Sequence, residues 1–302
     1  MADVQVEIEG RQLKLSNLDK VLYPEGGFTK GQVIDYYTRV APALLPHLRR
    51  RALTLKRYPN GVDAPFFYEK NCPKHRPDWV ATLPVWSARN KADVNYCLID
   101  DLPGLVWVAN LASLELHTSL SAADDYQKPT YVAFDLDPGA PATIVECCRV
   151  ALWLRSILDD LGLQAFPKTS GSKGLQVYVP LNTPVTYDQT KPFAHALAKV
   201  LEAQHPEEVL SVMAKDLRKG KVFIDWSQND DTKTTVCVYS LRARPTPTVS
   251  APVSWDEVEA GAGGEELSFT AGEALERVER DGDLWAPVEA VEQRLPAAPP
   301  AL

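Results

Sequence analysis

The sequence lacks the features of a membrane or secreted protein. No apolar run approaches the roughly 18 residues that a membrane span needs, and the N-terminus alternates apolar and acidic residues where a signal peptide would have a basic start and an apolar stretch. The five cysteines are odd in number and scattered, and no CxxC pair occurs. This pattern argues against a disulfide framework and against a structural zinc site. We therefore expect a cytoplasmic protein with reduced thiols and no membrane partner.

The sequence also lacks the composition of a disordered or fibrous chain. It has 16 glycines and 24 prolines among 302 residues, 45% apolar residues and 24% charged residues, which is the balance of a folded globular protein. The length accommodates one large domain or two of average size. Cys72 and His75 form a C-x-x-H fragment, but two ligands do not make a zinc site.

The sequence also has no net positive charge. The formal net charge is −8, and nucleic-acid-binding domains are usually basic over their contact face. Two local blocks are nevertheless basic: 47–57 holds five Lys or Arg residues and no acid, and 215–221 holds four around one Asp. Much of the acidity lies after residue 254. Because partners respond to local fields, these blocks indicate a surface that binds a polyanion.

Hydrophobic periodicity predicts an α/β (α+β) protein with a mixed central sheet flanked by helices. Strands are expected at 4–8, 11–15, 52–57, 94–99, 131–136, 175–181, 222–226 and 236–241. Helices are expected after Thr29 and at 142–161, 190–204, 254–259 and 270–281, whereas the type of 105–117 stays open. We expect one catalytic domain over 1–295, formed by an N-terminal α/β extension (1–130), a core (131–250) and C-terminal helices (251–295), with a flexible tail at 296–302.

Three aspartates lie in otherwise apolar strands. Asp135 and Asp137 are two positions apart, a spacing that places both side chains on one face of a strand. Asp225 lies between Ile224 and Trp226. Such carboxylates are costly unless a cation neutralises them, and hard oxygen ligands suit Mg²⁺ or Mn²⁺. The alternative is a surface turn in which Asp137 caps the chain and Asp135 is solvated.

A loop at 168–174 combines lysines, hydroxyl side chains and glycines. Glycines allow phosphates to approach backbone N–H groups closely. The spacing does not match a Walker A motif, and a strand follows instead of a helix. Arg242 and Arg244 could add fork-shaped phosphate ligands. A flexible surface loop and solvated arginines are the alternatives.

Aromatic and histidine side chains complete the candidate set. Phe66 and Phe67 precede a cluster of cations, as in surfaces that stack single-stranded bases, although core packing explains such rings equally well. His117 is a candidate ligand of a metal or a nucleotide, and a hydrogen-bonded core histidine is the simpler alternative.

Taken together, these segments resemble a known family, the polymerase domain of bacterial ATP-dependent DNA ligase D within the archaeo-eukaryotic primase superfamily. The resemblance runs in order over residues 13–255. The segments that carry it are Asn17-Leu18-Asp19-Lys20 with Lys30, Arg57-Tyr58-Pro59-Asn60-Gly61, Phe66-Phe67-Tyr68-Glu69-Lys70-Asn71, Leu114-Glu115-Leu116-His117, Phe134-Asp135-Leu136-Asp137-Pro138, Lys168-Thr169-Ser170-Gly171-Ser172-Lys173-Gly174-Leu175, Phe223-Ile224-Asp225 and Tyr239-Ser240-Leu241-Arg242-Ala243-Arg244-Pro245.

The resemblance implies a primase-polymerase that fills short gaps or extends ends at DNA breaks, in end joining or excision repair, and prefers ribonucleotides. It implies two Mn²⁺ or Mg²⁺ ions and a two-metal mechanism. The implied residues fall into four groups. They are Asp135, Asp137 and Asp225 for the catalytic metals; Ser170, Lys173, Gln176, Arg242, His117, Lys56 and Arg244 for the nucleotide; Asn17, Lys20 and Lys30 for a DNA 5′-phosphate; and Phe66 and Phe67 for stacking on template or downstream bases.

The sequence departs from the family pattern in two respects. Gln176 stands where the family's phosphate loop usually has histidine, and glutamine can donate a hydrogen bond but cannot carry charge. No K-x-D-G ligase motif occurs. We therefore expect a monomeric polymerase, associated with the nucleoid, that meets a separate ATP-dependent DNA ligase and the end-binding Ku protein. Its substrates would be NTPs and gapped or broken DNA with a 5′-phosphate.

Two other functions remain open from the sequence. A metal-dependent glycosyltransferase also uses a D-x-D motif with Mn²⁺, although it gives no role to Asp225, the basic blocks or the phenylalanine pair. A non-catalytic DNA-end adaptor would bind DNA without incorporating nucleotides.

Overall fold

The computed structural model describes residues 3–296. The chain divides into two compact units and passes between them several times. The first unit contains the chain up to Ser119 together with Thr234–Ser250 and Phe269–Asp283. The second contains Leu120–Lys233, Ala251–Ser268 and the chain from Leu284 onward. The predicted core at 131–250 thus contributes to both units, and most of the predicted tail lies outside the described residues.

The second unit is built on a five-stranded mixed sheet with the strand order β11-β12-β10-β14-β13. The β13 and β14 strands pair in parallel, and the other neighbours pair antiparallel. This sheet confirms the predicted fold class. Its strands are β10 (Tyr131–Pro138), β11 (Phe166–Thr169), β12 (Leu175–Pro180), β13 (Val209–Leu210) and β14 (Val222–Asp225).

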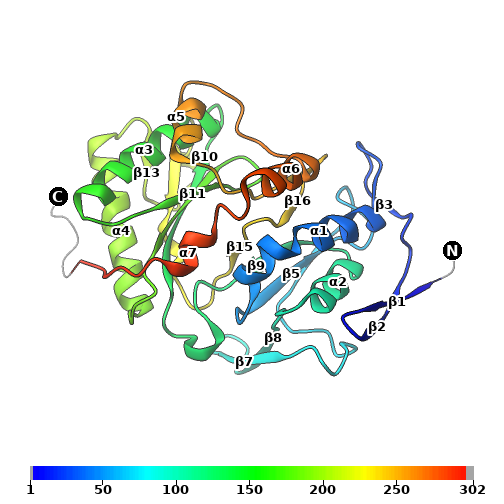
Figure 1. The fold of residues 1–302 in the computed structure, drawn as a ribbon. Helices are drawn as coiled ribbons and strands as arrows, with labels where there is room; N and C mark the ends of the chain where they lie inside the picture. The colour runs from blue at the N-terminus through cyan, green and yellow to red at the C-terminus, as the bar shows by residue number, and fades with distance from the viewer. Residues whose placement is uncertain (1–2, 297–302) are drawn as a thin grey trace. The chain divides into compact units, whose positions relative to one another are not determined.

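Helices pack against this sheet and against one another (Figure 1). The α3 helix (Ile144–Asp160) begins at a capping box formed by Thr143 and Glu146, and its apolar face is buried against β10 and β12. The α4 helix (Tyr187–Gln204) packs on β10 and β13, and α5 (Trp255–Ala262) packs on α3. A short α7 (Ala286–Ala290) lies on β12. The sheet is thereby held as a rigid support for the polar residues described below.

The first unit is built on a six-stranded sheet in which β15-β9-β5-β8-β7 form the path and β6 pairs with β5. Its central strands β5 and β9 are almost wholly buried. The strands are β5 (Leu53–Arg57), β6 (Phe67–Glu69), β7 (Thr82–Ser87), β8 (Ala92–Cys97), β9 (Ser113–Thr118) and β15 (Thr235–Val236). Three two-stranded ladders accompany this sheet: β1 (Val4–Ile8) with β2 (Arg11–Leu15), β3 (Val21–Tyr23) with β4 (Phe28–Thr29), and β16 (Leu241–Ala243) with β17 (Pro247–Val249).

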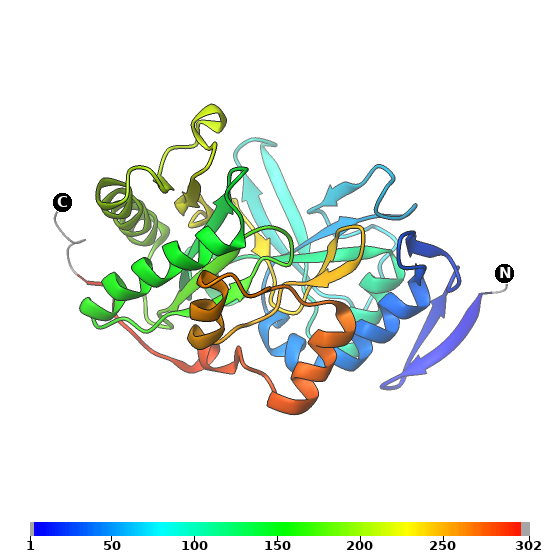
Figure 2. The ribbon, with the colours of Figure 1, turned by 90° about the horizontal axis from the view of Figure 1, so that it is seen from above.

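Three helices belong to the first unit. The α1 helix (Lys30–Leu48) begins at the predicted cap, Thr29, and packs on α2 (Leu102–Asn110). The α6 helix (Ala271–Asp281) lies alongside α1 (Figure 2), where Arg39 and Glu279 form an ion pair of 2.8 Å. Among the residues that the structure describes, no helix combines the length and the apolarity needed to cross a membrane.

The strand predicted at 236–241 is wrong in its extent. The β15 strand ends at Val236 and β16 begins at Leu241, because Tyr239 adopts a left-handed backbone conformation with φ of 62°. The undecided segment at 105–117 contains the end of α2 and most of β9, so it changes from helix to strand within a few residues.

The expectation of reduced thiols is wrong for two of the five cysteines. Cys72 and Cys97 form a disulfide across 25 residues of sequence. The backbone N–H of Cys72 donates to the carbonyl of Asn95, which holds the loop before β7 against β8 and brings the two thiols together. The scattered spacing concealed this contact, because only strand pairing creates it. The bond also removes Cys72 as a thiolate ligand, so the C-x-x-H fragment does not provide a metal site. The other cysteines, Cys147, Cys148 and Cys237, are free and buried.

Candidate functional site

A row of polar side chains crosses the sheet of the second unit. Strand register places Lys168 opposite Gln176, Gln176 opposite Asp135, and Asp135 opposite Asp225. Directly opposed residues project from the same face of a sheet. The Lys168 ammonium donates to the Gln176 amide oxygen at 2.6 Å, and the Gln176 amide nitrogen donates to Oδ1 of Asp135 at 3.0 Å. Four neighbouring strands therefore hold a cation, an amide and two carboxylates in sequence.

The other carboxylates have different surroundings. Oδ1 of Asp225 accepts hydrogen bonds from the backbone N–H and the hydroxyl of Ser227, and Oδ2 accepts one from the Gln228 amide at 2.7 Å. Asp137 lies two residues beyond Asp135 on β10, with a half-exposed side chain and Arg218 at 4.0 Å from Oδ2. The structure thus brings the three predicted aspartates to adjoining positions on two paired strands.

Negative charge is crowded where these two inner strands, β10 and β14, lie side by side. Burial, followed by the charges of Asp137 and Asp225, raises the pKa of Asp135 to about 7, although Gln176 and Lys168 oppose the shift. Within residues 3–296, no three His, Cys, Asp or Glu side chains are gathered as ligands of one ion. The donor chemistry nevertheless fits Mg²⁺ or Mn²⁺, because the site offers hard carboxylate oxygens whose mutual repulsion a divalent cation would offset.

The loop between β11 and β12 is tightly folded around Ser170. The Ser170 hydroxyl accepts hydrogen bonds from the backbone N–H groups of Ser172 and Gly174, and the Ser170 N–H donates to the Gly174 carbonyl. A Cβ atom at Gly174 would lie 2.0 Å from the carbonyl oxygen of Leu136, so this position requires glycine. The Lys173 side chain is exposed at the tip of the loop. The loop is therefore ordered by its own hydrogen bonds and presents one cation.

A pocket of about 450 Å³ lies beside this loop in the second unit. It is bounded by residues 171–174, by the connection from β10 to α3 and by 266–268. Most of its wall is apolar, and Lys173 and Glu266 supply the charged groups. The pocket gives the exposed face of the predicted phosphate loop room for a ligand.

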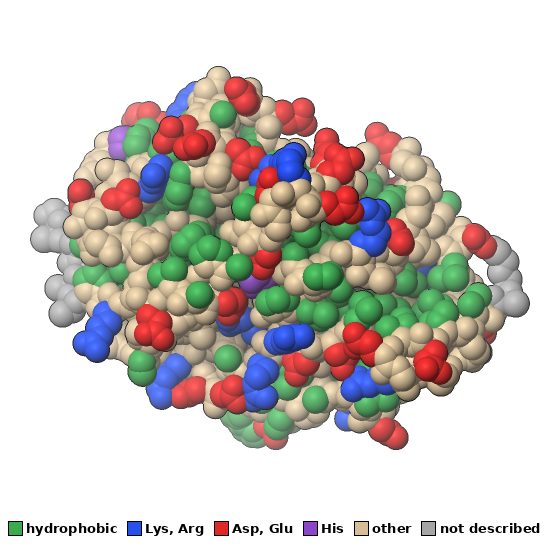
Figure 3. Space-filling model, viewed as in Figure 1, with side chains coloured by type: hydrophobic (Ala, Val, Ile, Leu, Met, Phe, Trp, Pro, Cys, Tyr) green, Lys and Arg blue, Asp and Glu red, His purple; other side chains and the backbone are tan. Residues whose placement is uncertain are grey.

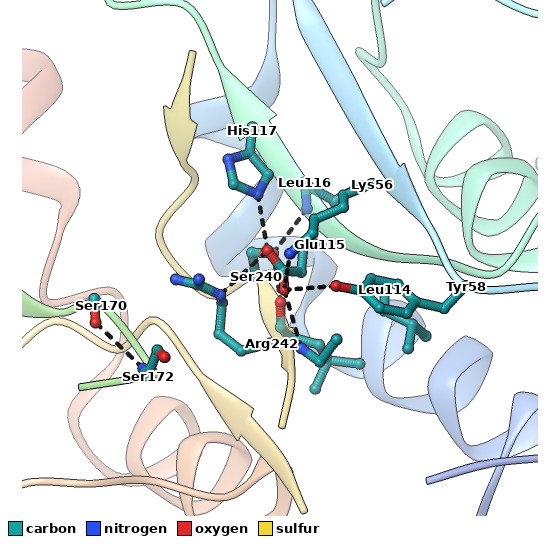
Figure 4. A network of polar contacts seen from close by, with 12 residues as sticks. Lys56, Tyr58, Leu114, Glu115, Leu116, His117, Ser170, Ser172, Ser240 and Arg242 are labelled. Atoms are coloured by element: carbon teal, nitrogen blue, oxygen red, sulfur yellow. Dashed lines mark hydrogen bonds and ion pairs between the residues drawn. The ribbon is translucent and has the colours of Figure 1, made fainter. Parts of the chain in front are cut away.

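The predicted nucleotide ligands of the first unit gather around a residue that had no predicted role, Glu115 on β9 (Figure 4). Oε1 of Glu115 lies 3.1 Å from the Lys56 ammonium, and Oε2 lies 2.9 Å from Nε2 of His117 and 3.3 Å from Nε of Arg242. Burial alone would raise the pKa of Glu115, but the hydrogen bond from His117 and the charges of Arg242 and Lys56 hold it well below its usual range. Glu115 is therefore an ionised, buried carboxylate.

Arg244 does not join this cluster. It follows β16, and its backbone N–H donates to the carbonyl of Arg242. Only the first of the two predicted arginines is therefore fixed by Glu115.

The residues predicted to bind a 5′-phosphate lie at a turn of the first unit and at the start of α1. Asn17 adopts a left-handed conformation with φ of 54°, and its carbonyl accepts from the Lys20 N–H. The Lys30 N–H donates to the Lys20 carbonyl, which brings the two lysines together. The Lys30 ammonium is buried and donates to the Ser16 carbonyl at 2.7 Å, whereas the Lys20 ammonium donates to the Asn60 side chain at 2.8 Å. Burial, followed by the charges of Lys20 and Arg57, lowers the pKa of Lys30 to about 8.

The predicted stacking residues are exposed, as a base-contacting surface requires. Phe66 and Phe67 are 49% and 44% exposed, and Tyr68 beside them is 57% exposed. Lys56 lies 4.5 Å from the centre of the Phe66 ring, and Arg57 lies 5.1 Å from that of Phe67. The exposure excludes core packing for both phenylalanines, and Tyr68, which belongs to the same aromatic run, is exposed as well.

The two basic blocks are only partly available at the surface. Arg51 is buried, and Arg49 donates to the Asp100 carbonyl, so this part of the first block serves the fold. Arg218 in the second block lies over the Phe223 ring at 3.9 Å. Lys and Arg side chains also lie among Asp and Glu side chains on the face seen in Figure 3. The structure therefore favours binding of a polyanion by individual Lys and Arg side chains over binding by one uniformly basic surface.

Sequence reasoning gave no role to Glu115 and counted Lys168 as a lysine of the phosphate loop, whereas Lys168 is buried in β11. Both occur inside motifs that had been noticed, and both are charged residues within buried strands. That combination is the pattern that could have identified them, since such charges are almost never buried unless they are paired.

Comparison with known proteins places the chain among DNA-repair polymerase domains. Residues 29–285 match the family model described as "LigD, primase-polymerase domain". The chain is 42% identical over 281 residues to a protein of Mycolicibacterium smegmatis named "Multifunctional non-homologous end joining protein LigD". It is 30% identical over 272 residues to the "Bifunctional non-homologous end joining protein LigD" of Bacillus subtilis. The alignments cover 92% and 90% of this chain, but only 36% and 43% of those proteins, so the chain spans less than half of their length.

A solved structure extends this similarity to three dimensions. The polymerase domain from Mycobacterium tuberculosis ligase D, in complex with DNA, matches with a TM-score of 0.86 and 40% sequence identity. The match covers 93% of this chain and 99% of that chain. At this identity and coverage, the similarity extends well beyond a shared architecture.

Proposed function

Because the chain belongs to the LigD primase-polymerase domain family, which consists of nucleotidyltransferases of the archaeo-eukaryotic primase type, we propose that it is a template-directed polymerase of DNA end joining. It would add nucleotides at short gaps and at the ends of broken DNA. The reaction is the in-line attack of a primer 3′-hydroxyl on the α-phosphate of a nucleoside triphosphate, with release of pyrophosphate. The observation that carries this proposal is the meeting of Asp135, Asp137 and Asp225 on two paired inner strands of the sheet.

The three aspartates would hold the divalent ions. Asp135 and Asp137 on β10 and Asp225 on β14 would supply the carboxylate oxygens. When bound, such ions lower the pKa of the attacking hydroxyl and offset the charge of the triphosphate. Gln176 supports this site through its hydrogen bond to Asp135. Both polar atoms of its amide group already have partners, because the oxygen accepts from Lys168 and the nitrogen donates to Asp135. We propose that Mn²⁺ or Mg²⁺ fills the site.

Residues that we propose as triphosphate ligands occur in each unit. Ser170 orders the loop that carries the exposed Lys173, whose ammonium group would bind a phosphate. Lys56 and Arg242 would provide further donors, His117 lies beside them, and Glu115 contacts all three. Arg244 would contribute charge without a fixed geometry. We propose NTPs as the preferred substrates.

DNA would be recognised through a phosphate and through its bases. Asn17, Lys20 and Lys30 would bind the 5′-phosphate on the far side of a gap, because backbone hydrogen bonds hold the three residues together. The exposed rings of Phe66 and Phe67 would stack on bases, which tolerates any sequence.

The relatives support a proposal for the cellular setting. They are bacterial end-joining proteins, and the present chain matches only part of each. We propose that it acts as a monomer at chromosomal breaks in the cytoplasm, together with an ATP-dependent DNA ligase and the end-binding Ku protein.

Extension of a short gapped duplex tests the function. NTPs and dNTPs are compared in Mn²⁺ and in Mg²⁺, with a 5′-phosphate or a 5′-hydroxyl at the gap. We expect additions dictated by the template, more of them with NTPs and with the 5′-phosphate. DNA binding without any incorporation, at every metal concentration, would instead identify an adaptor.

A further inference from the structure

Glu115 is surrounded by groups that donate hydrogen bonds or carry positive charge. Its side chain is 3% exposed. Besides Lys56, His117 and Arg242, the backbone N–H of Ala243 donates to Oε1 at 3.1 Å. One carboxylate therefore joins three segments of the first unit, namely β5, β9 and β16 (Figure 4).

Strand pairing sets this arrangement. Lys56 lies directly opposite Glu115, and Thr54 lies opposite His117, in the ladder between β5 and β9. The Leu116 N–H donates to the Ser240 hydroxyl, which fixes the chain just before Arg242 against β9. A buried carboxylate is costly, and replacing a buried ion pair by apolar residues is often neutral or stabilising. Packing alone thus gives little reason for a carboxylate at this position.

The contact with His117 also determines which ring nitrogen carries the proton. An ionised carboxylate can only accept hydrogen bonds, so Nε2 of His117 must be the donor across 2.9 Å. In the neutral ring, the other nitrogen, Nδ1, is then an acceptor. Burial lowers the pKa of His117, although Glu115 opposes that shift, which favours the neutral ring near pH 7.

We propose that Glu115 is a positioning residue for the polymerase reaction: it holds Lys56 and Arg242 toward the triphosphate and fixes His117 as the tautomer with an unprotonated Nδ1. The inference rests on the proposed function, because it assumes that these three groups meet the nucleotide. Glu115 itself does not contact substrate. It also neutralises one of the two fixed positive charges, so the cluster keeps a net positive charge for the polyanionic ligand.

The wild-type protein provides the first test. Nitrogen-15 NMR of the histidine side chains, with His117→Ala as the assignment control, reports the tautomer of His117 directly. We expect the pyridine-like resonance for Nδ1 and the protonated, pyrrole-like resonance for Nε2. A protonated Nδ1 in the neutral ring would overturn the proposal, and this result does not depend on any variant of Glu115.

The kinetic test uses Glu115→Gln, which keeps the shape and removes the charge. We expect kcat for gap filling to fall about 100-fold, the loss typical of a slightly misplaced catalytic constellation. KM for the NTP should change by less than about threefold, since losing a negative charge favours anion binding while positioning is lost. A variant that lowers kcat and raises KM to the same degree would contradict positioning.

A matched control exists in the same unit. His47 and Asp283 form another buried histidine–carboxylate contact, at 2.8 Å. Asp283→Asn should leave kcat within about threefold of the wild type and the tautomer of His117 unchanged. An equal loss of kcat in both variants would overturn the proposal, because removing any partly buried carboxylate of this unit would then lower kcat.

A double-mutant cycle isolates the connection to His117. If Glu115 acts partly through His117, then Glu115→Gln should cost much less in a His117→Ala background than in the wild type. Additive losses would refute the coupling. If the wild type does not extend primers at all, the proposed function is wrong. The role of Glu115 can then still be tested by the tautomer of His117, and by calorimetric binding of a non-hydrolysable ATP analogue to the wild type and to Glu115→Gln.

Discussion

Replacing Gln176 by leucine should destabilise the second unit more than an ordinary polar substitution does. The amide of Gln176 connects the buried ammonium of Lys168 to the carboxylate of Asp135. Leucine has nearly the same volume but neither accepts nor donates a hydrogen bond. The substitution therefore removes an acceptor from a cation that is 1% exposed.

The magnitude follows from the two bonds. Removing the amide acceptor of a hydrogen bond from a buried ammonium group costs about 1.5–3 kcal/mol. The loss at Asp135 is smaller, about 1 kcal/mol, since that carboxylate is only half-buried and water can replace the amide. The Tyr178 ring, 5.5 Å from the Lys168 ammonium, stays in place and limits the damage. We expect the free energy of unfolding to fall by about 2–4 kcal/mol.

Urea denaturation of the full chain measures this difference. Gln12→Leu is the matched control, because Gln12 lies on an exposed strand with one surface hydrogen bond to Glu7, and its effect should stay within about 0.5 kcal/mol. Adding Lys168→Met to Gln176→Leu should restore most of the lost stability, since the buried charge is then gone. A loss below about 1 kcal/mol for Gln176→Leu, or no recovery in the double variant, would refute the reasoning.

Three further predictions concern the first unit. The double variant Lys20→Ala/Lys30→Ala should erase the preference for 5′-phosphorylated over 5′-hydroxyl gaps in the extension assay, and a preserved preference would locate the phosphate site elsewhere. In the wild type, that preference should decline as the pH rises through about 8, because the pKa of Lys30 lies near that value and its ammonium is lost above it; a constant preference up to about pH 10 would contradict this role. Joint replacement of Cys72 and Cys97 by serine should lower the free energy of unfolding by about 3 kcal/mol, as expected for a bond that closes a loop of this length. Two free thiols at these positions in the purified protein, found by mass spectrometry without reductant, would refute the last prediction.

The carboxylate site could be predicted because its pattern is local. The spacing of Asp135 and Asp137 places both on one face of a strand, and Asp225 is conspicuous in an apolar run. The mixed sheet and the long helices follow from periodicity in the same way. Family membership, established by the comparisons, then excludes the glycosyltransferase alternative that the D-x-D motif alone left open.

The roles of Glu115 and Lys168 could not be predicted, because each depends on partners from other strands. The sequence around Glu115 does not indicate that Lys56 and Arg242 are its partners. These residues come together only where β5, β9 and β16 meet in the fold. The disulfide of Cys97 escaped notice for the same reason. Local patterns indicate which residues are unusual, whereas strand register decides what they contact.

The measurement that tests the account most directly is template-directed extension by Asp135→Ala, compared with the wild type at equal occupancy of gapped DNA. Asp137→Ala serves as the parallel variant, since both residues are proposed metal ligands on β10. We predict that both variants bind the gapped duplex as the wild type does and add no nucleotide in Mn²⁺ or in Mg²⁺. Extension by either variant at a rate comparable to that of the wild type would contradict the assignment of this carboxylate cluster as the catalytic centre.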